Sequence, residues 1–343
     1  MAGDLTMLQQ LCESSGISGD ESGVREMILA EISPFVADVK IDALGNLVAF
    51  KKGAKKASKK LMISAHMDEV GFIVTHVTDE GLLKFAPVGG IDANAIYGKP
   101  VTVGNKSLTG VIGVDKPVHL LKSEERQKSI AIDDMYIDIG ANDKRQALEH
   151  VMPGDTVSFP ANFKYENGMV KSKALDDRVG CFVLMNLIKQ DLPFDTYFSF
   201  VVQEEVGLRG AKVAAFGIDP DAAIVVEATT AADIKGTAPE KQVCRLSNGA
   251  VIAFMDKNTV YDRALYDLAL DLAKKNNIKV QVKSMVTGGN DAGAIHQSRA
   301  GVRTIAVSLP CRYLHTACGM ICADDIWETQ KLVEKLAEKI CNA

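Results

Sequence analysis

The stretch Leu61-Met62-Ile63-Ser64-Ala65-His66-Met67-Asp68 decides the fold class, because an apolar run of strand length ends abruptly in polar side chains. An uninterrupted apolar run of this length is typical of a strand that is buried on both faces. Three further runs of this kind occupy residues 196–202, 222–226 and 304–308. Because such strands need covering layers on both sides, the pattern predicts an α/β protein whose sheet carries helices on both faces.

Helical patterns separate and follow these strands, and the clearest amphipathic one covers residues 261–276. We predict helices at residues 7–11, 24–32, 179–189, 261–276, 292–298 and 324–340, with another that starts near Gly210. A hairpin is predicted over residues 39–50 and a further strand over residues 278–282. The alternation of strands and helices again favours a sheet with helices on both faces.

The middle of the chain has a different texture. Short β-like runs such as Gly71-Phe72-Ile73-Val74 and Gly110-Val111-Ile112-Gly113-Val114 alternate there with glycine and proline, and helical periodicity is scarce. This texture is typical of a small all-β module, either a barrel or a sandwich. We therefore predict an α/β domain formed by residues 1–68 and 162–343, with residues 69–161 inserted into it as a β domain.

Composition narrows the function classes. The 343 residues include 39 Lys and Arg against 44 Asp and Glu, a net charge of −5, which disfavours nucleic acid as a partner. The lysine-rich stretch at residues 51–60 lacks aromatic or arginine partners and is expected to be a solvated loop. No apolar run reaches the roughly 18 residues of a membrane span, and no secretory signal is expected at the start. Seven scattered cysteines without a CxxC pair indicate reduced thiols and a cytoplasmic protein.

Each of the four apolar strands runs into side chains that bind metals. The candidate ligands and their neighbours are His66 and Asp68 after the first strand, Glu204 and Glu205 after the second, Glu227 after the third and His315 beyond the fourth, together with Asp176 before a helix. In open α/β sheets, ligands bind outside the carboxyl ends of the strands. If the four strands are parallel neighbours, their polar ends share one crevice.

The residue types suit two divalent ions about 3.5–4 Å apart, which can clamp a water molecule and a carbonyl oxygen. A carboxylate such as Asp176 can bridge the two ions, with His66 and Glu227 on one and Glu205 and His315 on the other. Such donors favour zinc, cobalt or manganese over calcium. Asp68 can orient the imidazole of His66, and Glu204 remains as general base. Taken singly, Asp176 could also be a helix cap, His66 a core histidine and the Glu204-Glu205 pair a solvated turn.

Four motifs make the sequence resemble the M42 family of metallo-aminopeptidases, which includes glutamyl and tetrahedral (TET) aminopeptidases and has also been labelled endoglucanase or cellulase M. They are His66-x-Asp68, Ala174-Leu175-Asp176-Asp177-Arg178-x-Gly180, Gln203-Glu204-Glu205-Val206-Gly207-x-Arg209-Gly210 and Arg312-Tyr313-x-His315-Thr316. The resemblance covers essentially the whole chain. It also includes the Gly288-Gly289-Asn290-Asp291-Ala292 segment, where Asn290 and Asp291 are candidates for the substrate pocket or for a helix N-cap.

The resemblance implies a three-layer α/β/α sandwich of the phosphorylase/hydrolase type with an inserted β-barrel dimerisation domain. It implies two divalent ions per subunit, most often zinc, with Asp176 as the bridge and Glu204 as the base, and a cis peptide bond after Asp176. Short peptides would be the substrates. Dimers of the chain would assemble into a dodecamer.

Two positions depart from the family pattern. Glu227 stands where the family usually has aspartate, which puts the spacing and affinity of that metal site in question. After His315 the chain reads Thr316-Ala317-Cys318-Gly319, without the acidic residue of the usual Ser/Thr-Pro-x-Glu pattern. Cys311, Cys318 and Cys322 crowd this region, and packing is expected of them rather than metal binding.

Two other functions fit parts of the pattern. A metal-free glycoside hydrolase could use two carboxylates such as Glu204 and Asp176, but it leaves His66 and His315 without a role. A catalytically decayed shell or binding protein fits the two departures, although all five ligand positions hold competent side chains. A dinuclear aminopeptidase accounts for the whole set.

Overall fold

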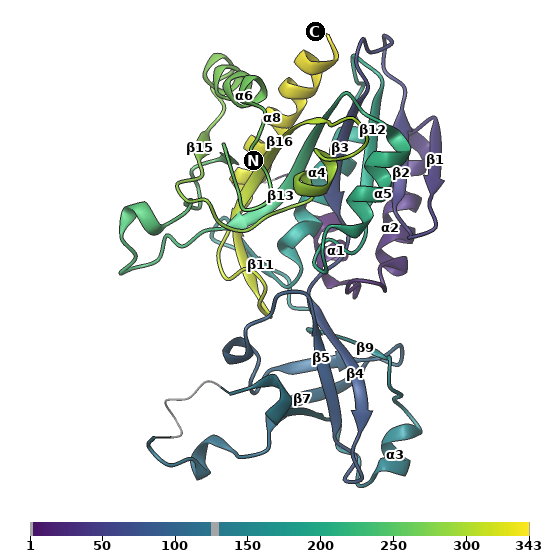
Figure 1. Cartoon of the computed structure of the whole chain (residues 1–343), viewed down its shortest axis with the longest axis vertical. Helices are drawn as coiled ribbons and strands as arrows, with labels where there is room; N and C mark the ends of the chain where they lie inside the picture. The colour runs from purple at the N-terminus through teal and green to yellow at the C-terminus, as the bar shows by residue number, and fades with distance from the viewer. Residues whose placement is uncertain (1–2, 125–129, 343) are drawn as a thin grey trace.

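The computed structural model describes residues 3–124 and 130–342, which form a large α/β lobe and a smaller β lobe (Figure 1). The α/β lobe is built on an eight-stranded sheet in the order β1-β2-β12-β3-β13-β16-β14-β15. Its strands are β1 (Asp38–Ile41), β2 (Leu47–Lys51), β3 (Leu61–His66), β12 (Thr196–Val201), β13 (Ala222–Thr230), β14 (Ala250–Ile252), β15 (Val280–Val282) and β16 (Arg303–Cys311).

The four strands that the apolar runs predict are consecutive neighbours in this sheet. Strand β12 pairs with β3, β3 with β13, and β13 with β16, each time in parallel. Their apolar character follows from their position, because every residue of β3 is buried and so is β13 up to its last residue. The condition for a shared crevice, parallel neighbours with a common carboxyl edge, is therefore met.

The sheet differs from the predicted pattern at its edges. The predicted hairpin is present as β1 and β2, which pair antiparallel. Strand β14 is not among the predicted strands; it is short, pairs antiparallel with β16 and carries β15 on its other side. Strands β13 and β16 run on past their predicted ends, because the apolar run stops while the ladder between them continues as far as Thr230 and Cys311.

Helices cover both faces of the sheet, which makes the lobe a three-layer α/β/α sandwich (Figure 1). One face packs against α4, α6 and α8, with α1 and α2 behind α4, around the larger hydrophobic core. The other face packs against α5 and α7 around a smaller core. The helices are α1 (Thr6–Glu13), α2 (Ser22–Ile32), α4 (Leu175–Ile188), α5 (Arg209–Ile218), α6 (Arg263–Lys275), α7 (Ala292–Ile295) and α8 (Ala323–Cys341).

The smaller lobe is a closed barrel rather than a sandwich, with the strand order β4-β5-β8-β7-β6-β9. Its strands follow β3 consecutively in the sequence. They are β4 (Gly71–Val77), β5 (Leu83–Val88), β6 (Pro100–Val103), β7 (Leu108–Val114), β8 (Met135–Asp138) and β9 (Thr156–Ser158), with helix α3 (Lys144–Leu148) beside them. The barrel has its own apolar core around Phe72, Phe85 and Phe159. A small third sheet joins β10 (Lys164–Glu166), β11 (Met169–Ser172) and β17 (Gly319–Cys322).

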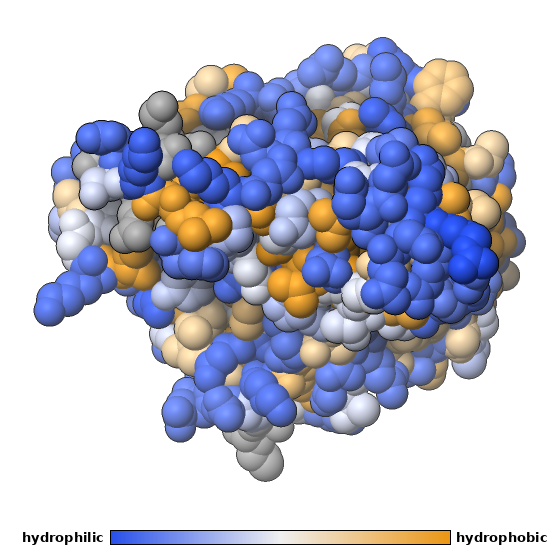
Figure 2. Space-filling model, turned by 90° about the horizontal axis from the view of Figure 1, so that it is seen from below, coloured by the Kyte–Doolittle hydropathy of each residue, from blue (hydrophilic) through white to orange (hydrophobic). Residues whose placement is uncertain are grey.

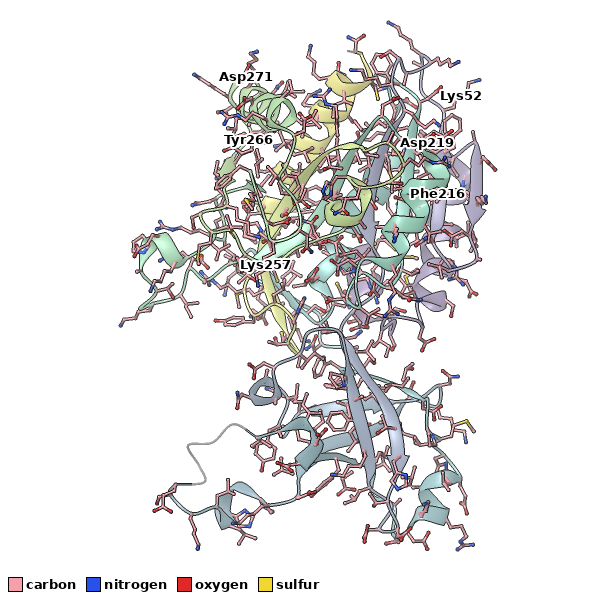
Figure 3. The ribbon with its side chains drawn as sticks, viewed as in Figure 1. Lys52, Phe216, Asp219, Lys257, Tyr266 and Asp271 are labelled. Carbon is pink, nitrogen blue, oxygen red and sulfur yellow. The ribbon has the colours of Figure 1, made fainter. Side chains whose placement is uncertain are left out.

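At the barrel end the surface is mostly hydrophilic (Figure 2), and the cysteines are unpaired, as the composition led us to expect. Seen from the barrel end, small apolar patches are scattered among hydrophilic side chains (Figure 2). Lys52, in the lysine-rich loop, lies at the end of the molecule away from the barrel (Figure 3). All seven cysteines are free. Within residues 3–124 and 130–342, no helix combines the length and the apolar character that crossing a bilayer requires.

Candidate metal centre

Asp176 lies between two histidines that come from opposite parts of the chain. Its Oδ1 atom lies 3.2 Å from Nε2 of His66, and its Oδ2 atom lies 3.3 Å from Nε2 of His315. The first two residues of α4 after its start, Asp176 and Asp177, have non-helical backbone angles and are joined by a cis peptide bond, as the resemblance implies. The two oxygens of one carboxylate thus face two different imidazoles.

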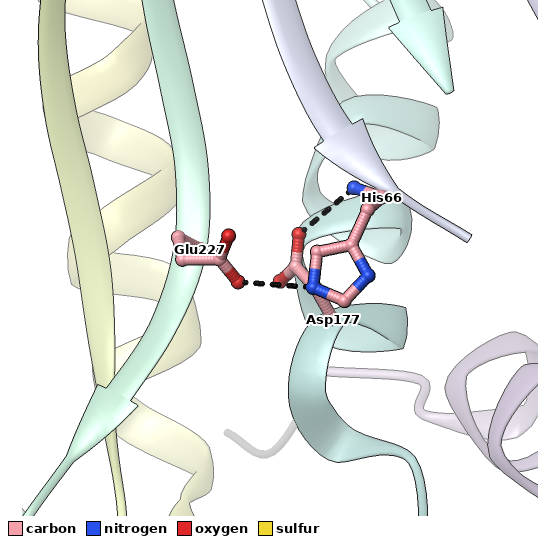
Figure 4. A group of neighbouring side chains, drawn as sticks. All are labelled: His66, Asp177 and Glu227. Carbon is pink, nitrogen blue, oxygen red and sulfur yellow. Dashed lines mark hydrogen bonds and ion pairs between the residues drawn. The ribbon is translucent and has the colours of Figure 1, made fainter. Parts of the chain in front are cut away.

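His66, the last residue of β3, is fully enclosed and has a partner on each side. Its Nε2 atom also lies 3.4 Å from Oε1 of Glu227 (Figure 4). Its Nδ1 atom lies 3.0 Å from the carbonyl oxygen of Asp68 and 3.4 Å from Oδ1 of that residue. Glu227 sits inside β13 rather than after it, on the same face as Ser308 of β16, with which it is paired. The longer arm of glutamate therefore reaches His66 from within the sheet.

Asp177 also lies within reach of His66 and Glu227, so it is a second candidate ligand beside Asp176. Its carboxylate, however, already accepts hydrogen bonds from the backbone N–H groups of Gly180, at 3.0 Å, and His66, at 3.3 Å (Figure 4). A carboxylate that satisfies buried backbone donors stabilises the local fold. Asp177 therefore holds the end of β3 against the start of α4, and Asp176 keeps its oxygens for the histidines.

The loop after β12 carries Glu204 and Glu205 and is held by Asp68. The carboxylate of Asp68 accepts hydrogen bonds from the backbone N–H groups of Glu204 at 3.0 Å and Glu205 at 3.1 Å, and from the hydroxyl of Ser18 at 2.6 Å. The side chain of Glu205 points to His315, with Oε2 3.3 Å from Nε2. Sequence reasoning expected Asp68 to orient His66 alone; its carboxylate also positions the two glutamates.

The barrel lobe reaches into this centre. Nδ1 of His315 lies 2.9 Å from the carbonyl oxygen of Gly90, in the segment that follows β5. A Cβ atom added to Gly90 would lie 3.4 Å from Nδ1 of His315, and one added to Gly89 would lie 3.2 Å from Cβ of Glu205. Glycine is needed at position 89, where φ is +89° and an added Cβ atom would also lie 2.8 Å from Cγ1 of Val70. His315 is oriented by a residue far away in sequence, which no local pattern could reveal.

Several charged groups in this small volume shift one another's pKa. Burial raises the pKa of Glu205 to about 8, and the charge of Asp176 adds to the effect. Burial likewise raises the pKa of Glu227 to about 8. Burial would lower the pKa of His315, but the hydrogen bond with Asp176 and the charges of Asp176 and Glu205 together outweigh it and raise the pKa to about 9. Burial raises the pKa of Glu204 well above its usual range. Without a cation, the cluster must hold protons to offset this concentration of negative charge.

The donor set fits divalent cations. Oε1 of Glu205 is buried and has no hydrogen-bond partner among the described residues, and an unpaired buried carboxylate oxygen is costly unless a cation or donor meets it. His66 belongs to two overlapping groups of three side chains whose donor atoms all lie within 4.8 Å of one another. Imidazole and carboxylate donors together favour zinc and similar ions over calcium.

A cavity of about 290 Å³ opens beside the centre, and His66, Asp176, Glu204, Glu227 and His315 line it. Asn290 also lines it, and its side-chain oxygen accepts a hydrogen bond from the N–H of Ala292, whereas Asp291 occupies the N-cap position of α7 without a side-chain cap hydrogen bond. Lys283, Asp256 and Tyr261 line the cavity as well and were missed by sequence reasoning. Lys283 directly follows the predicted strand at residues 278–282, but lysine is not a residue type that binds metals, so its position at a strand end gave no signal.

A buried ion pair joins the two segments that carry His66 and Asp176. Nζ of Lys173 lies 2.6 Å from Oε1 of Glu69, and both side chains are only 2% exposed. Glu69 also accepts a hydrogen bond from the N–H of Gly16 and lies 3.6 Å from a guanidinium nitrogen of Arg178. The pair therefore holds the turn after β3 against the segment before α4.

Replacing Lys173 with methionine is expected to lower the free energy of unfolding by about 3–5 kcal/mol, because Glu69 is left as a buried charge with only the more distant Arg178 guanidinium to balance it, besides the Gly16 N–H. Lys171 is a matched control, since its Nζ lies at the same 2.6 Å from Glu166 but the two side chains are 33% and 57% exposed. Lys171→Met is expected to cost no more than about 1 kcal/mol. Urea denaturation measures both values, and equal losses would contradict the assignment.

The fold and the donor set define a class of protein: three-layer α/β/α proteins with imidazole and carboxylate side chains that could hold a metal ion gathered at the carboxyl edge of the sheet. The sequence profile of the family described as M42 glutamyl aminopeptidase matches residues 45–332. The chain therefore belongs to the M42 glutamyl aminopeptidase family.

Similar proteins agree with this assignment. A lysyl aminopeptidase of Pyrococcus furiosus is 32% identical over 98% of this chain and 97% of its own length. The TET aminopeptidase of the Thaumarchaeota archaeon SCGC AB-539-E09 has a structure with a TM-score of 0.93 and 34% identity, covering 98% of this chain and 96% of its own. The TET1 peptidase of Pyrococcus horikoshii, described as assembling into a tetrahedron or a large octahedral shell, has a TM-score of 0.85 and 37% identity, with 97% and 98% covered.

Proposed function

We propose that this protein is a metal-dependent aminopeptidase that removes N-terminal residues from short peptides with two divalent ions. The observation that carries the proposal is the position of Asp176, whose two carboxylate oxygens face His66 and His315 at 3.2 and 3.3 Å. A carboxylate so placed suits a bridge between two cations. Membership of the M42 family supports the activity.

The five candidate ligands divide between two ions. His66 and Glu227, 3.4 Å apart, would hold one ion, and Glu205 and His315, 3.3 Å apart, would hold the other. Each ion would thus receive one imidazole and one carboxylate of its own besides a share of Asp176. Zinc is the ion that we favour for these donors, although cobalt and manganese tolerate the same set.

Glu204 is the general base in this proposal. It lines the cavity beside the ligands without belonging to either pair, and its backbone is fixed by Asp68. When bound, the ions polarise the scissile carbonyl and lower the pKa of water. The carboxylate of Glu204 takes a proton from the attacking water and later delivers it to the leaving amine nitrogen. Burial, which raises the pKa of Glu204, makes the carboxylate a better proton acceptor.

The concentration of carboxylates also explains why an exopeptidase fits better than an endopeptidase. Asp176, Glu204 and Glu227 all line the cavity, and Glu204, which belongs to neither proposed ligand pair, still presents negative charge to its contents when bound ions offset the charge of the other two. A free α-ammonium group of a peptide is attracted there, whereas an internal peptide bond offers no such group. The carboxylates therefore favour substrates with a free N-terminus.

Metal removal tests the proposed function. Dialysis against a chelator is expected to abolish hydrolysis of aminoacyl-p-nitroanilides, and readdition of zinc, cobalt or manganese is expected to restore it. Metal analysis of the purified protein is expected to give close to two ions per chain. Activity that survives complete chelation would contradict the proposal, and chelator-resistant release of reducing sugar would point to the glycoside hydrolase instead. Less than one ion per chain, with no activity on readdition, would favour a decayed protein.

We further propose that residues 69–161 form a dimerisation domain and that the dimers assemble into a dodecamer. Four large apolar side chains of this segment are exposed, Val111, Leu120, Leu148 and Met152, with exposures from 47% to 63%. Burial of exposed apolar side chains of this size against another protein surface would be favourable. The shells described for the TET1 peptidase of Pyrococcus horikoshii support the larger assembly. Sedimentation measures it, and a 36.9 kDa monomer would contradict it.

A further inference from the structure

We propose that the cavity beside the metal centre binds the side chain of the substrate's N-terminal residue, and that Lys283 selects an acidic one, glutamate or aspartate. The inference rests on the proposed aminopeptidase function, because only then does an N-terminal residue enter the cavity. It adds a substrate class and a residue that determines it.

Small side chains form the floor of the cavity, which leaves room for a substrate side chain. Ala306 and Ser308 of β16, Val251 of β14 and Ala253, the residue that follows β14, all line the cavity. Ala306 and Ala253 belong to the core on the α5 and α7 face of the sheet. The cavity therefore lies on that face, beside Glu227, whose partner in the ladder is Ser308.

Lys283 stands at the edge of this floor. Its backbone N–H donates to the carbonyl oxygen of Ile252 at 2.9 Å, so the parallel ladder of β14 and β15 continues one residue beyond Val282. In that register Lys283 is the neighbour of Ala253 and lies on the same face of the sheet. Strands are about 4.8 Å apart, so β15 lies about 14 Å from β13, and the four-carbon stem of a lysine bridges part of that span.

The ammonium group of Lys283 has donors to spare. It donates one hydrogen bond, to the carbonyl oxygen of Thr287 at 2.7 Å, and an ammonium group has three N–H donors. Within residues 3–124 and 130–342, no carboxylate lies at ion-pair distance from it. The adjoining backbone is Gly288, where an added Cβ atom would lie 4.0 Å from Nζ, so no side chain from that residue covers the amine.

Among the described residues, Asp256 is the other charged side chain in this part of the lining, and its oxygens already accept hydrogen bonds. Oδ1 of Asp256 accepts hydrogen bonds from the N–H groups of Asn258 and Thr259, both at 2.8 Å, and Oδ2 accepts one from the hydroxyl of Tyr261 at 2.5 Å. Asp256 is 1% exposed and so serves the loop rather than a ligand. Among the described residues that line the cavity, Lys283 is the one lysine or arginine.

The cavity is therefore bipolar. At the metal-centre end Glu204 belongs to neither ligand pair and keeps a free carboxylate when bound ions offset the charge of Glu227 and Asp176, and Lys283 makes the far part cationic. Burial lowers the pKa of Lys283, which means that its amine is partly withdrawn from water and gains more from a carboxylate than a surface lysine would. An N-terminal glutamate matches this arrangement, with its α-ammonium toward Glu204 and its side-chain carboxylate toward Lys283. An N-terminal leucine would leave the ammonium group of Lys283 without a carboxylate partner.

Family membership alone does not decide the substrate. The description of the family names a glutamyl aminopeptidase, whereas the relative from Pyrococcus furiosus is named a lysyl aminopeptidase. Related proteins are thus named for substrates of opposite charge. In this chain, Lys283 in the lining of the cavity favours the acidic class.

Hydrolysis of four p-nitroanilides, those of glutamate, glutamine, lysine and leucine, by the metal-loaded protein tests the inference. The wild type is expected to favour glutamate over glutamine, which has the same shape without the charge, by at least about tenfold in kcat/KM. Lys283→Met is expected to lower kcat/KM for the glutamate substrate by about 10–100-fold and to change the glutamine and leucine substrates by less than about threefold. Lys283→Glu is expected to make the lysine substrate better than the glutamate one. Lys274→Met, at an exposed site in α6, is the matched control and is expected to change none of them.

Calorimetry provides a readout that does not depend on turnover. Free glutamate is expected to bind the wild type more tightly than free glutamine, and Lys283→Met is expected to remove the difference. Equal kcat/KM for glutamate and glutamine substrates in the wild type, or an equal loss on all four substrates in Lys283→Met, would overturn the role of Lys283 and leave the aminopeptidase standing. If no substrate is hydrolysed and the loaded wild type holds less than one ion per chain, both proposals fall. If Lys283→Met does not fold, the comparison of glutamate and glutamine substrates in the wild type still decides whether the cavity selects an acidic side chain.

Discussion

Replacing Glu204 with glutamine is expected to lower kcat by about 10²–10⁴-fold, because the amide cannot accept the proton of the attacking water. The metal content is expected to stay near two ions per chain, since Glu204 belongs to neither proposed ligand pair. The backbone of the loop is held by hydrogen bonds to Asp68 that the substitution leaves intact. Steady-state kinetics and metal analysis on the same preparation measure the two effects.

The adjacent residue supplies the matched comparison. Glu205 lies 3.3 Å from His315 and has an unpaired buried oxygen, so Glu205→Gln is expected to lower the metal content toward one ion per chain as well as the activity. The two variants differ by one position in the sequence and should separate proton transfer from metal binding. If Glu204→Gln keeps wild-type kcat, Glu204 is not the base; if it loses metal as Glu205→Gln does, it is a ligand instead.

Replacing Asp176 with asparagine is expected to remove at least one ion per chain and to lower kcat/KM by more than about 10³-fold. Two dications 3.5 Å apart repel by about 5 kcal/mol even at the dielectric constant of water, and by about 19 kcal/mol at an effective value of 20. A bridging carboxylate offsets much of this repulsion, whereas a neutral amide offsets little. The shape of the side chain is retained, so folding should be preserved.

Asp271 in α6 is a suitable control for this variant, because it is exposed, pairs with Lys275 one helical turn on and lies far from the barrel end of the α/β lobe (Figure 3). Asp271→Asn is expected to keep two ions and full activity. Metal analysis by mass spectrometry and a peptidase assay give both quantities. An Asp176→Asn protein with two ions and activity within a few-fold of wild type would rule out a bridge at this position.

Much of the fold could be predicted because the signals are local. An apolar run such as residues 61–65 has to be buried wherever it lies, and the helical spacing at residues 261–276 predicts α6 without any knowledge of its neighbours. The texture of residues 69–161 predicted the barrel only as one of two all-β forms, since closure depends on which strands pair at the two ends, and the choice of a barrel came from the family resemblance. The direction of β14 could not be predicted, because a three-residue strand carries no signal of its orientation.

The candidate site shows the same division. Sequence patterns determined which residue types stand near strand ends, and hence that imidazoles and carboxylates are available for metal. Only the tertiary structure decided that β12, β3, β13 and β16 are neighbours, that Glu227 projects from within a strand, and that Gly90 of the barrel lobe meets His315. Lys283 enters the cavity for a similar reason, since its strand pairs with β14 rather than with the strands that carry the ligands. Hydrophobic burial and backbone periodicity act over a few residues and are written in the sequence, whereas contacts between distant segments depend on how the crossovers order and orient the strands.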